Sequence, residues 1–257
     1  TLLSRGKYGG NTTCFEVATE DSQIFVDAGT GFSYANIDED NKKVYLLFTH
    51  LHHDHLQGLL FNPRLFFSNK QILVSSALMD GATLKQHLSE YFSPPFFPPS
   101  VFSHVKCLNF VDFNHFNMQK SSDLIVECIG LKHPGGAIGY SFKSGTKKVV
   151  IALDNEFDPD QEPDLLGFCE NADILIWDGM YTNEEIIHKK GWGHSSIEQA
   201  IDFNSIANTT SDFNVCVEEV IRRINMAGHP QAKNSAGGSA FDPPAIFPVS
   251  ATDTNTG

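Results

Sequence analysis

The heptapeptide THLHHDH at positions 49–55 constrains the fold of this chain more than any other segment. It follows the apolar run at residues 44–48, which predicts a buried β-strand that ends in a cluster of imidazoles and one carboxylate. Alternate side chains of an extended segment share a face, so His50 and His52 can bind the same metal ion. The motif therefore predicts a metal site at the rim of a sheet.

The same heptapeptide offers a second pair of ligands. Asp54 and His55 fall where the chain turns, ahead of a helix that we expect to open at residues 56–60, and they can point at a second ion beside the first. Imidazole and carboxylate ligands with open positions for water suit Zn²⁺, Mn²⁺ or Fe. The alternative is a histidine-rich surface turn, which would leave four potential ligands in six positions unexplained.

Length and composition restrict the class of protein. The 257 residues suffice for one large domain or two small ones, and no apolar run approaches the ~20 residues of a membrane span. The net charge of −13 disfavours broad electrostatic binding of nucleic acid, although divalent cations would still permit an anionic substrate. Five widely spaced cysteines without a C-x-x-C pattern fit reduced thiols. We therefore expect a cytoplasmic protein without a membrane partner.

Apolar patterns predict strands early and late in the chain, with helices between and after them. This order favours an α+β fold in which sheet packs on sheet and helices flank the core. A loop containing four prolines at residues 93–99 excludes regular structure there. The predicted strands are 12–18, 24–26, 44–48, 71–75, 124–128, 139–142, 147–153 and 172–177, and the predicted helices are 79–91, 195–207 and 215–226.

Three more residues with metal or acid–base chemistry stand at the ends of predicted strands or in loops. They are His133, Asp154 and His194. A histidine in a loop is usually a surface residue, and an aspartate after a strand is usually a turn former. A pair of ions, however, needs a third ligand for the first ion and a carboxylate between the ions. His133 and Asp154 are the right chemical types for these two places.

In this number and order the motifs resemble those of the metallo-β-lactamase-fold hydrolases. The segments YGGNTTC at 8–14, DAGTG at 27–31, HPGG at 133–136 and GWGHS at 191–195 resemble one branch of that family. That branch is related to the tRNase Z enzymes and the phosphoribosyl cyclic phosphate phosphodiesterases. The resemblance runs from about residue 5 to about residue 203. It implies a four-layer αββα sandwich, with a hydrolase domain at 1–207. Residues 230–257 are rich in Ala, Pro, Ser, Thr and Gly, so we expect the remaining segment, 208–257, to be atypical and partly disordered.

The resemblance also implies a role for each matching residue. The first ion would be held by His50, His52 and His133, and the second by Asp54 and His55, with Asp154 bridging them. His194 would act near the scissile phosphate, as a proton donor or by stabilising charge. Asp54 would be a catalytic residue as well as a ligand. Asp27 would orient a ligand imidazole from outside the ligand shell. Asp178 would do similar work, unless it is only a turn or cap residue.

One departure from the family concerns the second ion. The family places a last histidine ligand on the strand after the helix that follows His194. Residues 204–220 contain no apolar run ending in histidine, and the only later one is His229. His229 could serve if the end of the chain folds back. Otherwise water completes the shell, and the second ion is bound weakly.

The leading prediction is a phosphodiesterase that uses two divalent ions, Zn²⁺ first and Mn²⁺ or Fe as alternatives, with a hydroxide bridging them as nucleophile. Its substrate would be a small or cyclic phosphodiester. The rivals are a tRNase Z-like RNA endonuclease, a hydrolase of a lactone, thioester or β-lactam, and a non-catalytic metal-binding protein with a degraded second site. The acidic charge weighs against nucleic acid without excluding it. The protein could act as a monomer or as a homodimer.

Overall fold

The computed structural model describes residues 10–37, 42–67, 69–98, 101–119, 124–207, 214–215 and 248–250. These residues group into two compact units, each containing a β-sheet and helices. We name each after the part of the chain that supplies most of it. The N-terminal unit holds the described residues of 12–128, 142–147 and 248–250, and the C-terminal unit those of 10–11, 129–141, 148–207 and 214–215.

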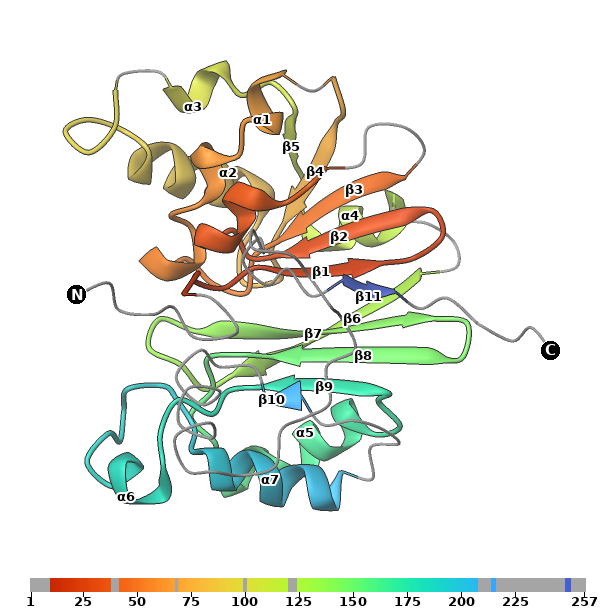
Figure 1. The fold of residues 1–257 in the computed structure, drawn as a ribbon, viewed down its shortest axis with the longest axis vertical. Helices are drawn as coiled ribbons and strands as arrows, with labels where there is room; N and C mark the ends of the chain where they lie inside the picture. Colours follow the sequence, from red (N-terminus) through yellow and green to blue (C-terminus); the bar gives the residue numbers. More distant parts are fainter. Residues whose placement is uncertain are drawn as a thin grey trace, which may run out of the picture. The chain divides into compact units, whose positions relative to one another are not determined.

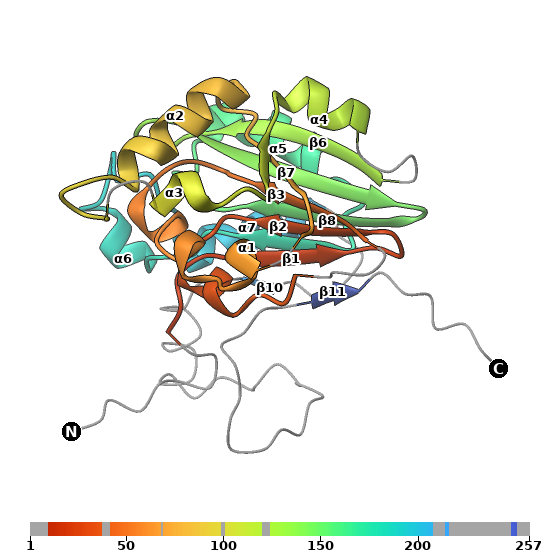
Figure 2. The same ribbon diagram turned by 90° about the horizontal axis from the view of Figure 1, so that it is seen from above.

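The N-terminal unit is built on a six-stranded sheet in the order β11-β1-β2-β3-β4-β5 (Figure 1). Strands β2 to β5 are parallel to one another, β1 is antiparallel to β2, and β11 lies parallel beside β1 (Figure 2). The strands are β1 (Phe15–Ala18), β2 (Ser22–Val26), β3 (Lys43–Leu47), β4 (Ile72–Ser75), β5 (Leu108–Phe110) and β11 (Pro248–Ser250).

Helix α2 (Gly81–Tyr91) covers the N-terminal sheet with one apolar face. Its side chains Leu84 and Leu88 are fully buried in a cluster with strand residues such as Leu46. Tyr45 alternates to the other face of β3 and packs edge-on against Phe116 of α4 (Phe113–Gln119), with ring centroids 5.3 Å apart. The short helices α1 (Arg64–Phe67) and α3 (Val101–His104) complete this unit.

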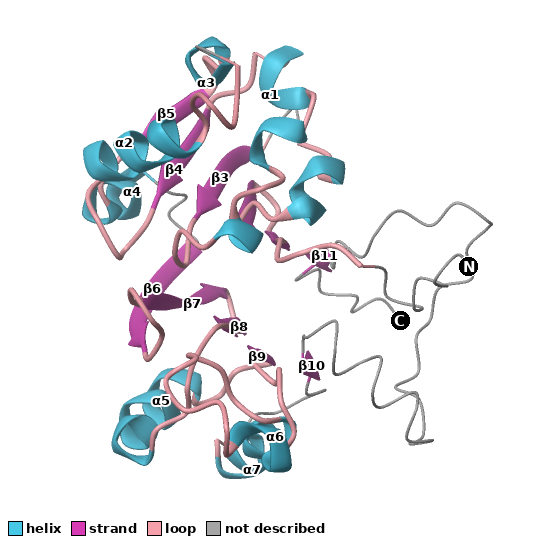
Figure 3. Ribbon diagram, turned by 90° about the vertical axis from the view of Figure 1, so that its left-hand side faces the viewer, coloured by secondary structure: helices cyan, strands magenta, loops and turns pink. Residues whose placement is uncertain are grey.

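The second sheet has the order β10-β9-β8-β7-β6, and most of it belongs to the C-terminal unit. Helices α5 and α7 lie along β8 and β9 (Figure 3), where Trp177 of β9 stacks on Phe203 of α7 at 4.4 Å. The strands are β6 (Leu124–Leu131), β7 (Ala137–Ser144), β8 (Lys147–Ala152), β9 (Ile174–Trp177) and β10 (Asn214–Val215). The helices are α5 (Glu162–Cys169), α6 (Asn183–Ile186) and α7 (Ile197–Ile206).

The helix expected to open at residues 56–60 was wrong. The segment instead follows the 3₁₀ turn η2 (His53–His55) and runs into a second one, η3 (Leu59–Phe61). The N–H of Gly58 donates to the carbonyl of Ala28 at 2.9 Å, so this backbone bonds to a neighbouring loop rather than to a helix of its own. The approach is so close that a Cβ at Gly58 would lie 1.8 Å from the carbonyl oxygen of Gly29.

Two further expectations about the chain after α7 need correction. Val215, predicted to begin a helix, lies in β10, which pairs in parallel with β9. The sequence did not indicate this strand, because a strand of two residues has no readable apolar period. The rest of the predicted helix 215–226 lies outside the described residues. Among the described residues, no helix is long and apolar enough to cross a membrane.

Candidate metal centre

In the N-terminal unit, the predicted ligands of the heptapeptide gather in the turn that follows β3. The ring centroids of His50 and His52 are 4.5 Å apart, and those of His50 and His55 are 4.2 Å apart. His50 and His55 are buried, whereas His52 and Asp54 are exposed. Nε2 of His55 lies 3.5 Å from the Asp54 carboxylate. The turn therefore gathers three imidazoles and one carboxylate, two of them reachable from solvent.

Asp27, at the end of β2, orients two of these imidazoles. Its carboxylate contacts Nδ1 of His55 at 2.8 Å and accepts a hydrogen bond from the Thr49 hydroxyl at 2.7 Å. That hydroxyl lies 3.0 Å from Nδ1 of His50. Because the hydroxyl hydrogen is directed at Asp27, the Thr49 oxygen accepts from Nδ1–H of His50. Both imidazoles are then held in the tautomer that leaves Nε2 without a proton and able to bind a metal ion.

The Asp27 carboxyl group is completely buried, and its surroundings act on its pKa in opposite directions. Burial raises the pKa of Asp27, while the contacts with His55 and Thr49 oppose that rise. The backbone N–H of Thr49 binds the other carboxylate oxygen at 2.8 Å. Both oxygens are therefore engaged, and the orientation of the carboxylate is fixed.

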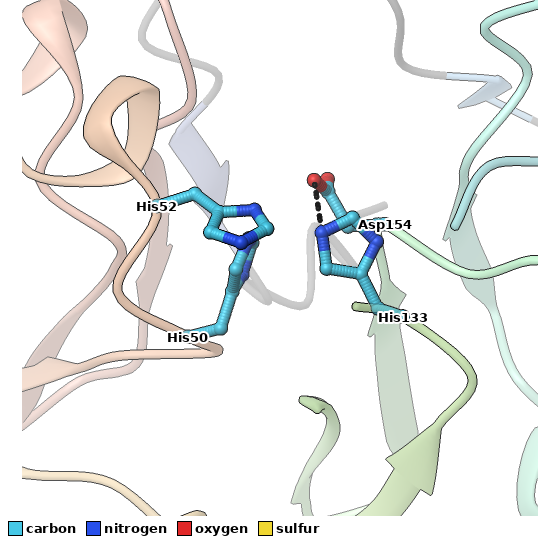
Figure 4. A group of neighbouring side chains, drawn as sticks. All are labelled: His50, His52, His133 and Asp154. Atoms are coloured by element: carbon cyan, nitrogen blue, oxygen red, sulfur yellow. Dashed lines mark ion pairs between the residues drawn. The ribbon is translucent and has the colours of Figure 1, made fainter. Parts of the chain in front are cut away.

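In the C-terminal unit, His133 and Asp154 lie together after β6 and β8. Nε2 of His133 is 3.7 Å from the Asp154 carboxylate, the pair joined by a dashed line in Figure 4, which also draws His50 and His52. Nδ1–H of His133 donates to the carbonyl of Gly193 at 2.7 Å. A carbonyl oxygen only accepts, so the proton stands on Nδ1, and Nε2 is left for a metal ion.

His194 and Asp178 form a second pair in the same unit. The Asp178 carboxylate contacts Nδ1 of His194 at 2.8 Å and accepts from the backbone N–H groups of Asn155 at 3.2 Å and Met180 at 3.0 Å. Burial raises the pKa of Asp178, and the hydrogen bond with His194 opposes this. The rings of His133 and His194 are 5.3 Å apart. Asp178 therefore sets the orientation of an imidazole beside a predicted ligand.

Two of the predicted carboxylates occupy unusual backbone conformations directly after a strand. Asp27 has φ +63° and Asp154 has φ +48°, in the left-handed region that non-glycine residues seldom adopt. Such conformations cost about 1–3 kcal/mol each and persist where the surrounding structure imposes them. Here they turn each carboxylate toward a histidine.

Several contributing residues were not predicted from the sequence. Thr49 links Asp27 to His50, and the Ser195 hydroxyl binds the carbonyl of Asn155. Glu156 accepts from the N–H groups of both Gly191 and Gly193. Thr49 lies inside the heptapeptide, and Gly191, Gly193 and Ser195 lie inside the segment GWGHS, whereas Asn155 and Glu156 had no readable signal. His53 is exposed and contacts the Tyr91 hydroxyl. His229 lies outside the described residues.

Comparisons with known proteins identify the family and the fold of this chain. A family model described as the beta-lactamase superfamily domain matches residues 23–210, and a comparison with curated proteins gave no match.

Human tRNase Z, short form, is 16% identical, with 81% of this chain and 86% of that chain covered and a TM-score of 0.59. The metallo-beta-lactamase fold protein YhfI from Bacillus subtilis is 16% identical, with 85% of each chain covered and a TM-score of 0.57. Zn²⁺-bound PqqB from Methylobacterium extorquens is 14% identical, with 76% and 72% covered and a TM-score of 0.51. At these identities the likeness to the solved structures shows the fold alone, and the predicted α+β class is confirmed.

Proposed function

Because this chain belongs to the beta-lactamase superfamily and has the metallo-β-lactamase fold, we propose that it is a metal-dependent hydrolase of a small or cyclic phosphodiester. The observation that carries the phosphodiesterase assignment is the His194–Asp178 pair beside His133. A histidine held by a carboxylate can give a proton to a leaving alkoxide. An alkoxide is a poor leaving group, so a phosphodiester needs this assistance more than an activated ester does.

We assign the metal ligands on the chemistry of the donor set. Nδ1 of each of His50, His55 and His133 has a hydrogen-bond partner within its own unit, so each ring presents Nε2 as the donor atom. Imidazole with carboxylate suits Zn²⁺, with Mn²⁺ or Fe as alternatives. One ion would be held by His50, His52 and His133 and another by Asp54 and His55, with Asp154 shared.

Bound divalent ions would polarise the phosphoryl oxygens and lower the pKa of a water molecule. The chain's own residues perform the remaining tasks. His194, with Nδ1 fixed by Asp178, would donate the proton on Nε2 to the leaving oxygen. Asp54, whose carboxylate is exposed, would accept a hydrogen bond from the attacking water. Asp27 would hold His50 and His55 in position throughout.

The alternatives make different demands on the chain. RNA cleavage would require a basic surface for the phosphate backbone, which a net charge of −13 disfavours. Hydrolysis of a thioester would use the same ions but would gain less from His194, because a thiolate leaves without a proton. A lactone or a β-lactam releases an alkoxide or an amine that His194 could also protonate, so relative rates decide between these substrates and a phosphodiester. A non-catalytic role would follow if the second ion is not bound. Binding of that ion depends on its last ligand, and we propose His229 for this position.

A substrate panel tests the proposed function. We expect protein loaded with Zn²⁺ or Mn²⁺ to hydrolyse bis(p-nitrophenyl) phosphate and a cyclic nucleotide, and to be much slower on a lactone, a β-lactam and precursor tRNA. Faster cleavage of precursor tRNA would favour the endonuclease. Faster cleavage of the lactone or β-lactam would overturn the phosphodiesterase assignment.

His194→Ala should lower kcat for an alkyl phosphodiester by about 100- to 10,000-fold, the usual contribution of a general acid. Metal content should be unchanged, because His194 is not among the proposed ligands. Replacing the exposed His188 of the same segment by Ala is the matched control and should change neither quantity. Loss of an ion from His194→Ala would make His194 a ligand and contradict its assignment as an acid.

A further inference from the structure

A line of aromatic rings and one lysine leads from the histidines of the C-terminal unit to its surface. The rings of His133 and His194 are 5.3 Å apart, and those of His194 and Tyr181 are 6.1 Å apart. Nζ of Lys189 lies 5.7 Å from the centre of the Tyr181 ring and 3.9 Å from that of Trp192. One cation thus lies near two aromatic rings, closer to that of Trp192, where the line ends.

Trp192 is displayed by a loop that is held in place. Gly191 and Gly193, on either side of it, both have φ +83°, and the N–H groups of both donate to the Glu156 carboxylate at 2.7 and 3.1 Å. Trp192 is nevertheless 57% exposed, whereas the other tryptophan, Trp177, is fully buried. Exposing a large aromatic side chain on an ordered loop forfeits the free energy of its burial. Packing against the described residues therefore does not account for the exposed position of Trp192.

We propose that Trp192 and Lys189 form a binding subsite for the nucleobase of a nucleotide phosphodiester. The proposal rests on the proposed function, since it places the phosphate of the same substrate at His194. An exposed indole offers a π-face on which any base can stack. The ammonium group of Lys189 lies over one face of the indole, holds its orientation and attracts the negative charge of the phosphate, so the base would stack on the other face. The substrate class is thereby narrowed to diesters that carry an aromatic base.

Two cyclic phosphates, one with a base and one without, separate the contribution of the subsite to KM from that of the phosphate. With 2′,3′-cyclic AMP, Trp192→Ala should raise KM about tenfold, the usual effect of removing one stacked base, and leave kcat unchanged. Glycerol 1,2-cyclic phosphate has the same cyclic phosphate without a base, and its KM should not change. Trp192→Phe should keep most of the affinity, which a loop distortion would not allow. The control Ile187→Ala alters an exposed apolar side chain of the same segment and should behave like the unaltered protein.

Tryptophan fluorescence provides a readout that does not require turnover. The chain has two tryptophans, and Trp177 is buried, so quenching by a stacked base reports on Trp192. AMP should quench the Zn²⁺-loaded protein and ribose 5-phosphate should not, and the quenching should vanish in Trp192→Phe. Quenching by AMP with no diester hydrolysed would refute the proposed function and leave the subsite standing.

The opposite combination overturns the subsite alone. It would consist of hydrolysis of both cyclic phosphates, a KM for 2′,3′-cyclic AMP that Trp192→Ala does not raise, and no quenching by AMP. The Lys189–Trp192 contact would then be an ordinary surface cation–π pair. A KM that rises equally for both substrates would also overturn the subsite, because the loss would not depend on the base.

Discussion

Asp154→Ala is expected to lower kcat/KM for a phosphodiester by more than about 1,000-fold and to reduce the number of bound ions. Asp154 is proposed to be shared by both ions, so its loss removes a ligand from each. Its backbone has φ +48°, and its carboxylate lies 3.7 Å from Nε2 of His133.

The measurement for Asp154→Ala combines metal analysis of the dialysed protein with steady-state kinetics. Asp160→Ala, which removes an exposed carboxylate from the loop after β8, is the matched control and should keep both the ions and the activity. If Asp154→Ala retained the full metal content and the full rate, the proposed ligand set would be refuted.

Gly193→Ala should both destabilise the protein and reduce kcat/KM by about 100-fold or more, the scale of losing correct positioning at a reacting centre. A Cβ at this position would lie 2.2 Å from Nδ1 of His133 and 2.3 Å from Cδ of Pro134. The carbonyl of Gly193 also accepts the hydrogen bond that fixes the His133 tautomer. The added methyl group must therefore displace either the loop or the imidazole.

Gly191→Ala separates this contact from backbone strain. Gly191 has the same φ of +83°, but a Cβ there would meet no atom within 4 Å. Gly191→Ala should lower the free energy of unfolding only by the strain of a left-handed residue, about 1–3 kcal/mol, as measured by thermal unfolding. Its kcat/KM should change little. Equal losses of activity in the two variants would show that the contact with His133 is not what matters.

The long apolar runs predicted the central strands correctly, and short or locally ambiguous elements were missed. Strands β2, β3 and β8 lie where the sequence placed them, because their buried residues form continuous runs. Strand β5 has three residues and β10 has two, too few for a periodic signal. The expected helix at 56–60 failed because the N–H of Gly58 bonds to Ala28, a partner that local propensity cannot supply.

The residues that carry metal chemistry could be named from the sequence, but their supports could not. His50, His52, Asp54 and His55 form a dense local motif. The supports join residues far apart in the chain, as with Thr49 and Asp27, 22 positions apart, or Gly193 and Glu156, 37 apart. Such pairs arise from the packing of strand ends, and no spacing rule identifies them in one sequence.

The central claim is that this chain hydrolyses phosphodiesters with bound divalent ions. Its most direct test is to strip the protein with a chelator, titrate Zn²⁺ or Mn²⁺ back, and follow bound metal and hydrolysis of bis(p-nitrophenyl) phosphate together. We predict that hydrolysis is lost on stripping and returns as the metal content rises to two ions per chain. A fully metal-loaded protein that does not hydrolyse the diester, or a stripped protein that still does, would contradict the claim.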